Sequence, residues 1–366
     1  MTKDVIFWYE NRNNVPQEGY TMKRMLRVLA PFIIGAYCIR LTPDTQVYAA
    51  PNPEQTLTNT TPHHFIFLPL VQNSYTATEL PPVTPPTPAP TPPADLWNSV
   101  ESWVYQLSGY PNDKLTQIAG SNFDLAVIDL ARDGSDDYFT YSEIQAVKAT
   151  GKIVLAYFEI GAIEDYRPEW PAVPADLMLG AVDGWPSEQY VKYWDSRWWT
   201  IVAKGRIDQA LAAGFDGAYL DMVVTYEEIP ADAAGTNRDD LARKMVDLLI
   251  EISAYAKSQN PNFKIVPQNS PELYVYPGYL SAIDGLGIEE LYILATDQPC
   301  TYNWCYENRN NAATIHAAGK LVLTIDYANV QTNINTAYTQ SLAAGFVPYV
   351  SVRDLDVMRI NPGWEP

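Results

Sequence analysis

The stretch Gly214-Phe-Asp-Gly-Ala-Tyr-Leu-Asp221 shows how this chain is built. It follows a segment with helical periodicity, Ile201–Ala213, and the glycine stands where a helix is expected to end. The apolar run Gly217–Val223 is typical of a short buried strand, and Asp221 falls near the end of that strand. The repeating unit is therefore a helix, a glycine, a buried strand and an acid.

The same unit recurs along the chain from residue 103 to residue 352. Eight apolar runs, dense in Val, Ile, Leu and Tyr, are expected strands: Trp103–Leu107, Leu125–Leu130, Ile153–Ile160, Gly217–Val223, Lys264–Gln268, Gly285–Glu289, Leu321–Asp326 and Val347–Val352. The expected helices between them include Tyr141–Ala149, Ile201–Ala213, Arg238–Lys257 and Asn311–Ala318. This alternation predicts an α/β fold in which helices cover a parallel sheet.

Length favours one closed barrel over an open sheet. The eight expected strands lie within Asp95–Pro366, and a (β/α)8 TIM barrel needs about 250 residues. We therefore predict a (β/α)8 TIM barrel over residues 95–366. The alternative is an open doubly wound sheet, but no G-x-G-x-x-G follows the first strand and no Walker loop is present.

The composition indicates a folded domain and excludes some classes of partner. Of 366 residues, 47% are hydrophobic and 18% charged, which is enough apolar material for a large core. The formal net charge is −19, and the whole excess lies after residue 94. Nucleic acids and anionic lipids need a basic surface, so we expect neither as a partner. The acidity attracts cations, although it can equally serve only to keep an exported protein soluble.

Residues 1–94 are expected to direct export. Three basic residues from Lys23 to Arg27 precede an apolar run at 28–39, which is shorter than the roughly 20 helical residues that span a bilayer. With the small-residue site before Ala50, this pattern is typical of a signal peptide. We predict a mis-assigned upstream start at 1–21, a signal peptide at 22–49 and a Pro/Thr-rich linker at 50–94. We expect a secreted monomer with no stable membrane span, which the linker could tether to a cell surface.

Cysteine usage agrees with export. Cys300 and Cys305 remain once Cys38 leaves with the signal peptide, and a local disulfide is the default for such a pair in an oxidising compartment. A lipoprotein that uses Cys38 is the less favoured alternative, because Tyr37 is bulky where such sites need a small residue. Only His316 lies near the pair, so we expect neither a metal nor a cofactor.

Most of the expected strands carry a polar side chain at or near their C-terminal end. Chemistry in a barrel takes place at the C-terminal ends of the strands, and an acid is costly to bury there without a partner. The strand-end candidates are Asp129, Glu159, Asp221, Gln268, Asn269, Glu289, Asp326 and Tyr327. Structural roles are open for some of them: Asp129 could cap a loop or pair with Arg132, and Asp326 could fasten a loop.

Any catalysis must depend on carboxylates. The chain has three histidines, two of them in the linker and one on an expected helix, which argues against a histidine-dependent triad or a typical zinc hydrolase. Ten Trp and 25 Tyr are many for this length, and aromatic faces stack on sugar rings. Some of these aromatics must instead cover the barrel. Carboxylates together with aromatics point to glycosides.

Six segments occur in order along the chain: Tyr157-Phe-Glu-Ile-Gly-Ala-Ile-Glu-Asp-Tyr-Arg167, Tyr193-Trp-Asp195, Gly214-Phe-Asp-Gly-Ala-Tyr-Leu-Asp221, Pro267-Gln-Asn269, Gly287-Ile-Glu289 and Ile325-Asp-Tyr327. In these segments the sequence resembles the glycoside-hydrolase family of endo-α-1,4-polygalactosaminidases. The resemblance implies a secreted TIM-barrel enzyme that cleaves α-1,4-linked galactosamine polymers, with Asp221 and Glu289 as its catalytic residues.

The expected substrate-binding set joins the strand ends with the segments that carry the resemblance. It comprises Asp129, Tyr157, Glu159, Asp165, Tyr166, Arg167, Trp194, Asp195, Asn269, Asp326 and Tyr327. One departure leaves substrate preference open, because family members often have glutamate where this chain has Ala162, and a small residue where it has Glu159.

The positions of the two expected catalytic acids suggest a mechanism. Asp221 ends the fourth expected strand and Glu289 the sixth, so they should face each other across the barrel mouth. By analogy with other α-glycosidase barrels, Asp221 is the expected nucleophile and Glu289 the general acid/base of a retaining enzyme. The alternatives are a hydrolase of an N-acetylated or mixed glycan and a non-catalytic carbohydrate-binding barrel.

Overall fold

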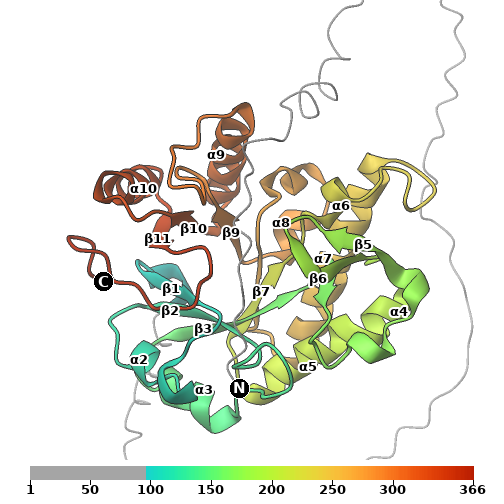
Figure 1. Cartoon of the computed structure of the whole chain (residues 1–366), viewed down its shortest axis with the longest axis horizontal. Coiled ribbons are helices and arrows are strands. Elements are labelled where there is room, and N and C mark those ends of the chain that lie inside the picture. The colour runs from blue at the N-terminus through green and yellow to red at the C-terminus, as the bar shows by residue number, and fades with distance from the viewer. Residues whose placement is uncertain (1–95) are drawn as a thin grey trace, which may run out of the picture. The chain divides into compact units, whose positions relative to one another are not determined.

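Eight parallel strands form the centre of this protein in a computed structural model (Figure 1). The structure describes residues 96–366, so the predicted upstream start, signal peptide and linker all lie outside the described residues. The eight expected strands are confirmed, each to within two residues of its predicted end. They are β1 (Trp103–Gln106), β2 (Leu125–Asp129), β3 (Ile153–Glu159), β7 (Gly217–Asp221), β8 (Lys264–Pro267), β9 (Gly285–Glu289), β10 (Leu321–Tyr327) and β11 (Val347–Ser351).

The strands pair in the order of a TIM barrel. One ladder runs β1-β2-β3-β7-β8 and a second runs β9-β10-β11, all parallel. A bridge between Gln268 and Gly287 joins the two ladders. At the other seam, the indole Nε1 of Trp103 donates a hydrogen bond to the carbonyl oxygen of Val347 at 3.0 Å. The strand order follows the sequence without reversal, which excludes the open doubly wound sheet.

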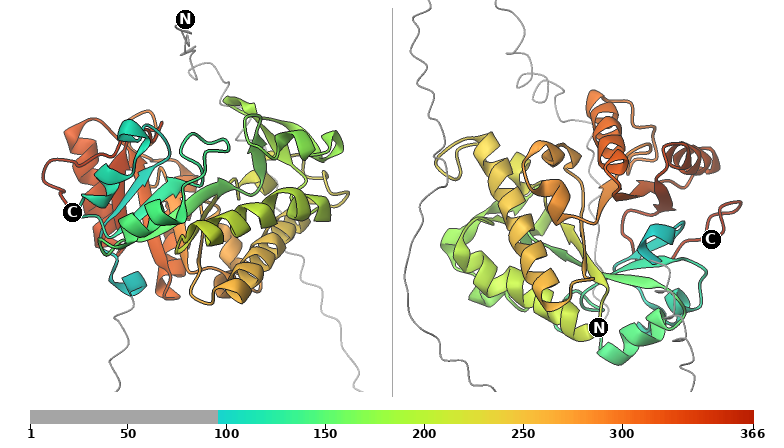
Figure 2. Two further views of the ribbon diagram at one scale, coloured as in Figure 1. Left: turned by 90° about the horizontal axis from the view of Figure 1, so that it is seen from below. Right: turned by 180° about the vertical axis from the view of Figure 1, so that it is seen from behind.

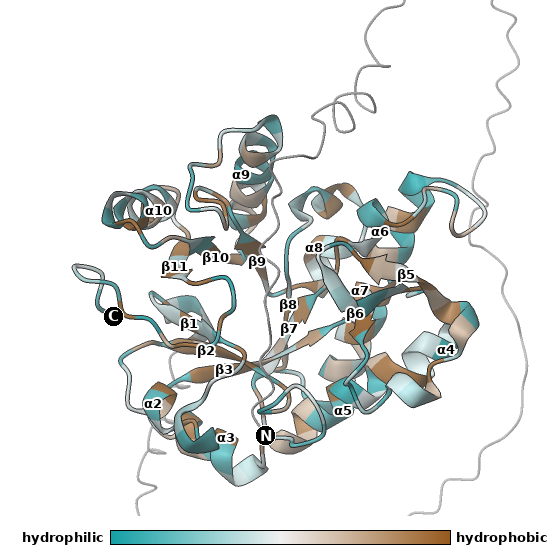
Figure 3. Ribbon diagram, in the orientation of Figure 1, coloured by the Kyte–Doolittle hydropathy of each residue, from teal (hydrophilic) through white to brown (hydrophobic). Residues whose placement is uncertain are grey.

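Helices surround the strands (Figure 2). The longer ones are α3 (Tyr141–Lys148), α5 (Lys204–Ala213), α7 (Arg238–Gln259), α9 (Asn303–Ala317) and α10 (Gln331–Ala343), and the single turns are α2 (Thr116–Ala119), α4 (Ser196–Trp198), α6 (Thr225–Glu228) and α8 (Tyr279–Ala282). Their ends follow local sequence: Thr140 and Glu143 form a capping box at the start of α3. Gly214 ends α5 with φ 82°, as expected from its place in the sequence. The strands are hydrophobic and the outer helical faces more polar (Figure 3).

Aromatic side chains fill the barrel beneath the strand ends. Trp103, Tyr105 and Tyr219 are fully buried, and the ring centroids of the two tyrosines lie 5.1 Å apart. A Cβ atom at Gly287 would lie 1.9 Å from the phenol oxygen of Tyr219, so only glycine fits beside this ring. The glycine two residues before Glu289 is therefore required by packing. The packed rings of Trp103, Tyr105 and Tyr219 thus hold in place the strands that carry the polar residues.

A small antiparallel sheet follows β3, in a segment where the sequence predicted no strand. Its strands are β4 (Ala162–Glu164), β5 (Met178–Val182) and β6 (Trp185–Val191), paired in the order β4-β6-β5. The pairing places Glu164 directly opposite Glu188. Among residues 96–366, no helix is long and apolar enough to cross a membrane.

Candidate active site

One amide joins the two expected catalytic acids at the mouth of the barrel. Asp221 ends β7 and Glu289 ends β9, while Gln268 directly follows β8 between them. The Nε2 of Gln268 donates to Asp221 Oδ1 at 3.0 Å and to Glu289 Oε2 at 2.8 Å, so these two oxygens lie no more than 5.8 Å apart, the sum of the two distances. The phenol of Tyr105 donates to Gln268 Oε1 at 2.9 Å, which orients the amide. The barrel thus brings together two acids that are distant in sequence.

Asp221 accepts two further hydrogen bonds. The backbone N–H of Met222 donates to its Oδ1 at 2.6 Å, and the phenol of Tyr157 donates to its Oδ2 at 2.7 Å. Hydrogen bonds to a carboxylate favour its charged form. Burial has the opposite and larger effect. Together with the negative charge of Glu289, it raises the pKa of Asp221 to about 7. The carboxyl of Asp221 is therefore held in one orientation and poised near neutral pH.

The carboxylate of Glu289 is also held by hydrogen bonds from neighbouring side chains. The phenol of Tyr327 donates to its Oε1, and the Nδ2 of Asn269 donates to its Oε2 at 2.9 Å. The backbone N–H of Glu289 donates to Asn269 Oδ1 at 3.0 Å. Of the expected substrate-binding residues, Tyr157, Asn269 and Tyr327 therefore contact the two acids directly.

The backbone turns sharply after each of these strand ends. Met222, Asn269 and Glu290 have φ of 57°, 63° and 53°, in the left-handed region that non-glycine residues rarely adopt. Such residues cost about 1–3 kcal/mol each and cluster at functional sites. At Met222 this conformation accompanies the hydrogen bond from its N–H to Asp221. Local strain is thus concentrated at the three strand ends that carry the polar residues.

A second group of acids lies beside Asp221. Glu159, Glu164 and Glu188, the glutamate trio, are buried, and each has one carboxyl oxygen without a hydrogen-bond partner within residues 96–366. Burial, followed by the charges of Glu164 and Glu188, raises the pKa of Glu159 well above its usual range. Burial and the charge of Asp221 raise the pKa of Glu188 to about 8. Glu159 and Glu188 therefore favour their protonated forms near neutral pH, and a cation placed beside them would favour their charged forms.

Arg167 and Asp129 form a buried ion pair. The two terminal nitrogens of Arg167 donate to the two oxygens of Asp129, each at 3.0 Å, and its Nε donates to Glu164 Oε1 at 3.0 Å. Asp129 does not pair with Arg132, which instead contacts Glu143. The structure thus gives Asp129 and Arg167 a positioning role that ties β2 to the segment after β4.

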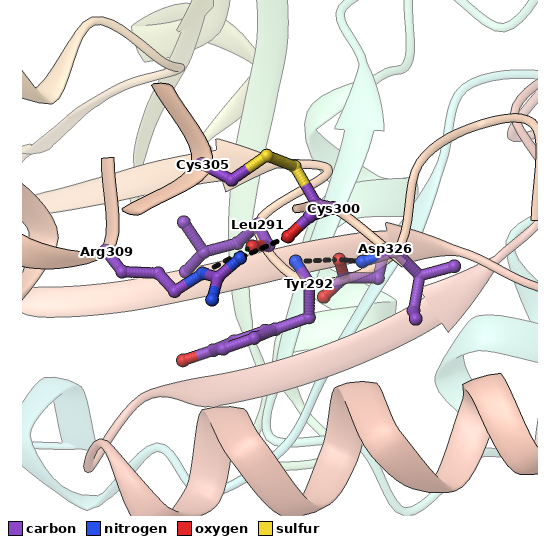
Figure 4. The surroundings of a disulfide bond; sticks show 7 residues. Leu291, Tyr292, Cys300, Cys305, Arg309 and Asp326 are labelled. Atoms are coloured by element: carbon purple, nitrogen blue, oxygen red, sulfur yellow. Dashed lines mark hydrogen bonds between the residues drawn. A yellow bond between two sulfur atoms is a disulfide. The ribbon is translucent and has the colours of Figure 1, made fainter. Parts of the chain in front are cut away.

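Asp326 holds a loop and does not contact the two expected catalytic acids. It is fully buried, and its Oδ1 accepts hydrogen bonds from the backbone N–H groups of Tyr292 and Ile293, each at 2.7 Å (Figure 4). Cys300 and Cys305 form a disulfide in the same region. The loop-fastening alternative therefore describes Asp326 better than substrate binding does.

The remaining expected residues lie on the segment after β3. Asp195 caps α4 and pairs with Arg197, which gives its carboxylate a structural role. Trp194 packs edge-on against Tyr193, at 4.9 Å between ring centroids. Tyr166 is exposed and donates to Glu164 Oε1 at 3.2 Å, and Asp165 is exposed as well.

Stability should fall as pH rises, because several buried carboxyls have a raised pKa. Burial is the main cause, and it brings the pKa of Asp326 to about 7 and that of Glu188 to about 8. The folded protein then favours the protonated forms of these carboxyls. Their contribution to the free energy of unfolding is therefore present near pH 4 and is lost as the pH approaches 8. We expect the melting temperature to be higher at pH 5.5 than at pH 8. Glu188→Gln should raise it by about 2 °C or more at pH 8 and less at pH 5.5. Equal shifts at both pH values would contradict this.

Comparison with known proteins places the chain among glycoside hydrolases. The family profile of glycoside-hydrolase family GH114 matches residues 84–364. An uncharacterised protein of Deinococcus radiodurans is 36% identical over 286 residues, which cover 77% of this chain and 89% of that protein. An uncharacterised protein of Methanocaldococcus jannaschii is 33% identical over 278 residues, which cover 72% of this chain and 78% of that protein.

Two solved structures share the fold. The crystal structure of Aspergillus fumigatus Ega3 in complex with galactosamine has a TM-score of 0.56 at 18% identity, covering 71% of this chain and 95% of that chain. The glycoside hydrolase domain of PelA from Pseudomonas aeruginosa has a TM-score of 0.55 at 16% identity, covering 70% of this chain and 97% of that chain. The family resemblance is confirmed: the chain belongs to glycoside-hydrolase family GH114 and is a glycosidase.

Proposed function

We propose that this protein hydrolyses α-1,4-linked galactosamine polysaccharide with retention of configuration, using Asp221 as nucleophile and Glu289 as general acid/base. The observation that carries the proposal is the single Gln268 amide that bonds both carboxylates and keeps their facing oxygens within 5.8 Å. Retaining glycosidases hold their two carboxyls about 5–5.5 Å apart, whereas inverting enzymes need about 6.5–9.5 Å. The galactosamine bound to Ega3 supports the choice of sugar.

The mechanism has two displacements at one carbon. Asp221 attacks the anomeric carbon and forms a glycosyl-enzyme ester, while Glu289 gives its proton to the departing glycosidic oxygen. Glu289 then takes a proton from a water molecule, whose oxygen attacks the same carbon and releases Asp221. The hydrogen bond from Tyr157 to Asp221 keeps the nucleophilic oxygens oriented.

The ionisation of Asp221 sets the lower end of the active pH range. Burial and the charge of Glu289 raise the pKa of Asp221 to about 7, and only the ionised carboxylate can attack the anomeric carbon. We expect kcat/KM to rise about tenfold per pH unit from pH 5 toward pH 7, as the ionised fraction of Asp221 grows. Initial rates on a galactosamine oligomer from pH 5 to 9 measure this. A rate that is already level at pH 5 would contradict a nucleophile with a raised pKa.

The acidic surface should draw a cationic polymer toward the site. The net charge is −19, and the glutamate trio lies beside Asp221. Attraction between exposed charges is screened by salt, so kcat/KM on deacetylated polymer should fall as ionic strength rises. The same measurement on a neutral N-acetylated polymer is the control. If salt leaves both rates unchanged, acidity serves only solubility.

Product analysis tests the function itself. The full chain is incubated with α-1,4-galactosamine oligomers, with their N-acetylated and mixed counterparts, and the products are analysed by mass spectrometry. We expect cleavage of the deacetylated oligomers. Preferential cleavage of an acetylated oligomer would replace the substrate, and binding without turnover would indicate a non-catalytic carbohydrate-binding barrel. Export through the predicted signal peptide would bring the enzyme to such an extracellular polysaccharide.

A further inference from the structure

A pocket of about 370 Å³ opens beside Glu289. Glu289 and Asn269 form part of its wall, but Asp221 is not among its lining residues. Five of the ten lining residues are glutamates, Glu227, Glu228, Glu272, Glu289 and Glu290, and none is basic. The pocket therefore continues the mouth of the barrel and carries a strong negative potential.

Ser270 indicates that the pocket takes a polar ligand. It lines the pocket and is only 6% exposed, yet its Oγ has no hydrogen-bond partner within residues 96–366. A buried hydroxyl without a partner costs free energy. Its backbone is also in the left-handed region, with φ 50°. A hydroxyl or amine of a bound sugar would satisfy this oxygen.

An aromatic face completes the pocket. Trp304, near the start of α9, lines it and is 39% exposed. The ring of Tyr302 lies nearly parallel to that of Trp304, with planes 10° apart and centroids separated by 6.1 Å. Exposed aromatic rings of this kind stack on the apolar faces of sugars and attract cations.

The segment that carries Trp304 is fixed in place before any ligand binds. The Cys300–Cys305 disulfide brackets it, and Arg309 donates to the backbone carbonyl oxygens of Leu291 and Cys300 (Figure 4). Arg309 also lies over the ring of Tyr306, at 4.6 Å from the ring centroid. Little conformational entropy remains to be lost when a ligand meets Trp304.

We infer that this pocket is a binding subsite for a 2-amino sugar on the leaving-group side of the scissile bond, with Trp304 against the sugar ring and the glutamates around its ammonium group. The inference rests on the proposed function, in which Glu289 protonates the departing oxygen. A sugar that contacts Glu289 but not Asp221 is then the departing one.

The glutamates of the pocket repel one another until a cation arrives. Burial and the charge of Glu272 raise the pKa of Glu227 to about 7. The phenol of Tyr226 donates to both of these carboxylates. An ammonium group bound between them would replace the repulsion with attraction, which favours a deacetylated sugar over an acetylated one.

The dependence of the rate on the leaving group tests the subsite. A galactosamine oligomer and α-galactosaminyl fluoride, whose leaving group is not a sugar, are each digested by the full chain and by its Trp304→Ala and Glu227→Gln variants. Every cleavage of the oligomer places a departing sugar beside Glu289, so we expect both variants to lower kcat/KM on the oligomer roughly 3- to 10-fold. On the fluoride we expect kcat/KM to stay unchanged, because no departing sugar fills the subsite.

Tyr141→Ala is the matched control, since Tyr141 is 60% exposed at the start of α3. Trp304→Ala behaving like this control, or an equal loss on the oligomer and on the fluoride, would overturn the inference while leaving the proposed hydrolysis intact. If the natural chain cuts no galactosamine oligomer, the proposed function fails instead. Calorimetry with a galactosamine trimer, on the full chain carrying Asp221→Asn, then decides the subsite: it stands if Trp304→Ala weakens binding and falls if it does not.

Discussion

Replacing Asp221 with asparagine should reduce kcat on a galactosamine oligomer by at least about 10⁴-fold, as expected when a covalent nucleophile is removed. Asparagine is nearly isosteric, and its side-chain oxygen can still accept from Met222 and Gln268. The fold should therefore remain intact while no glycosyl ester forms. A substrate with a better leaving group should not restore the rate, because the missing group is the attacking one.

Glu289→Gln should behave differently. On the oligomer we expect a loss of about 10²–10⁴-fold, the usual value of a general acid/base. On an aryl α-galactosaminide with a good leaving group, the first step needs no protonation, so the variant should release a burst of the aryl alcohol. Added azide should then restore turnover by attacking the glycosyl-enzyme in place of water.

An exposed acid supplies the control for both variants. Asp176 pairs with Arg197 at the surface, and Asp176→Asn should leave both rates unchanged. If azide and a good leaving group rescue Asp221→Asn but not Glu289→Gln, the two roles are exchanged. If neither variant loses activity, the pair is not the catalytic one.

Arg167→Ala should cost about 3–5 kcal/mol of the free energy of unfolding, because it leaves two carboxylates buried without their cation. The side chain of Arg167 is 5% exposed and bridges Asp129 and Glu164. Burial already raises the pKa of Asp129 in spite of the arginine. Without Arg167 the carboxyls should take up protons, so the loss should be larger at pH 8 than at pH 5.

Arg197 provides a matched control for this prediction. It also bridges two aspartates, Asp176 and Asp195, but its side chain is 45% exposed. Surface ion pairs contribute little, so Arg197→Ala should leave the free energy of unfolding nearly unchanged. Urea unfolding of both variants at the two pH values gives the comparison. Equal losses for the two arginines would show that burial of the pair does not matter.

The barrel strands could be predicted from the sequence because each is a short apolar run, and most of them have a polar residue at or next to their end. β7 illustrates this, since Gly214 ends the preceding helix and Asp221 closes the strand. The antiparallel strands β4, β5 and β6 could not be predicted from the sequence in this way. β5 contains Gly180 and its pairing with β6 shifts register, so period-two alternation of apolar residues is absent.

The small antiparallel sheet of β4, β5 and β6 accounts for most of the contacts in the site that the sequence did not predict. Glu188 lies beside Glu164 only because β6 pairs with β4, so the glutamate trio leaves no local pattern. Asp129 meets Arg167 rather than the nearby Arg132 for the same reason. By contrast, the proximity of Asp221 and Glu289 could be predicted, because strand ends of a barrel converge whatever the loops do. The role of Gln268 follows from its place between them.

Identification of the covalently labelled residue tests the central claim most directly. A 5-fluoro-α-galactosaminyl fluoride retains the amine, and its fluorine at C5 slows the second displacement, so that the glycosyl-enzyme accumulates. Mass spectrometry of the digested protein should find the added sugar on the carboxylate of Asp221. A label on Glu289 or elsewhere, or turnover to the inverted product with no label, would contradict the assignment.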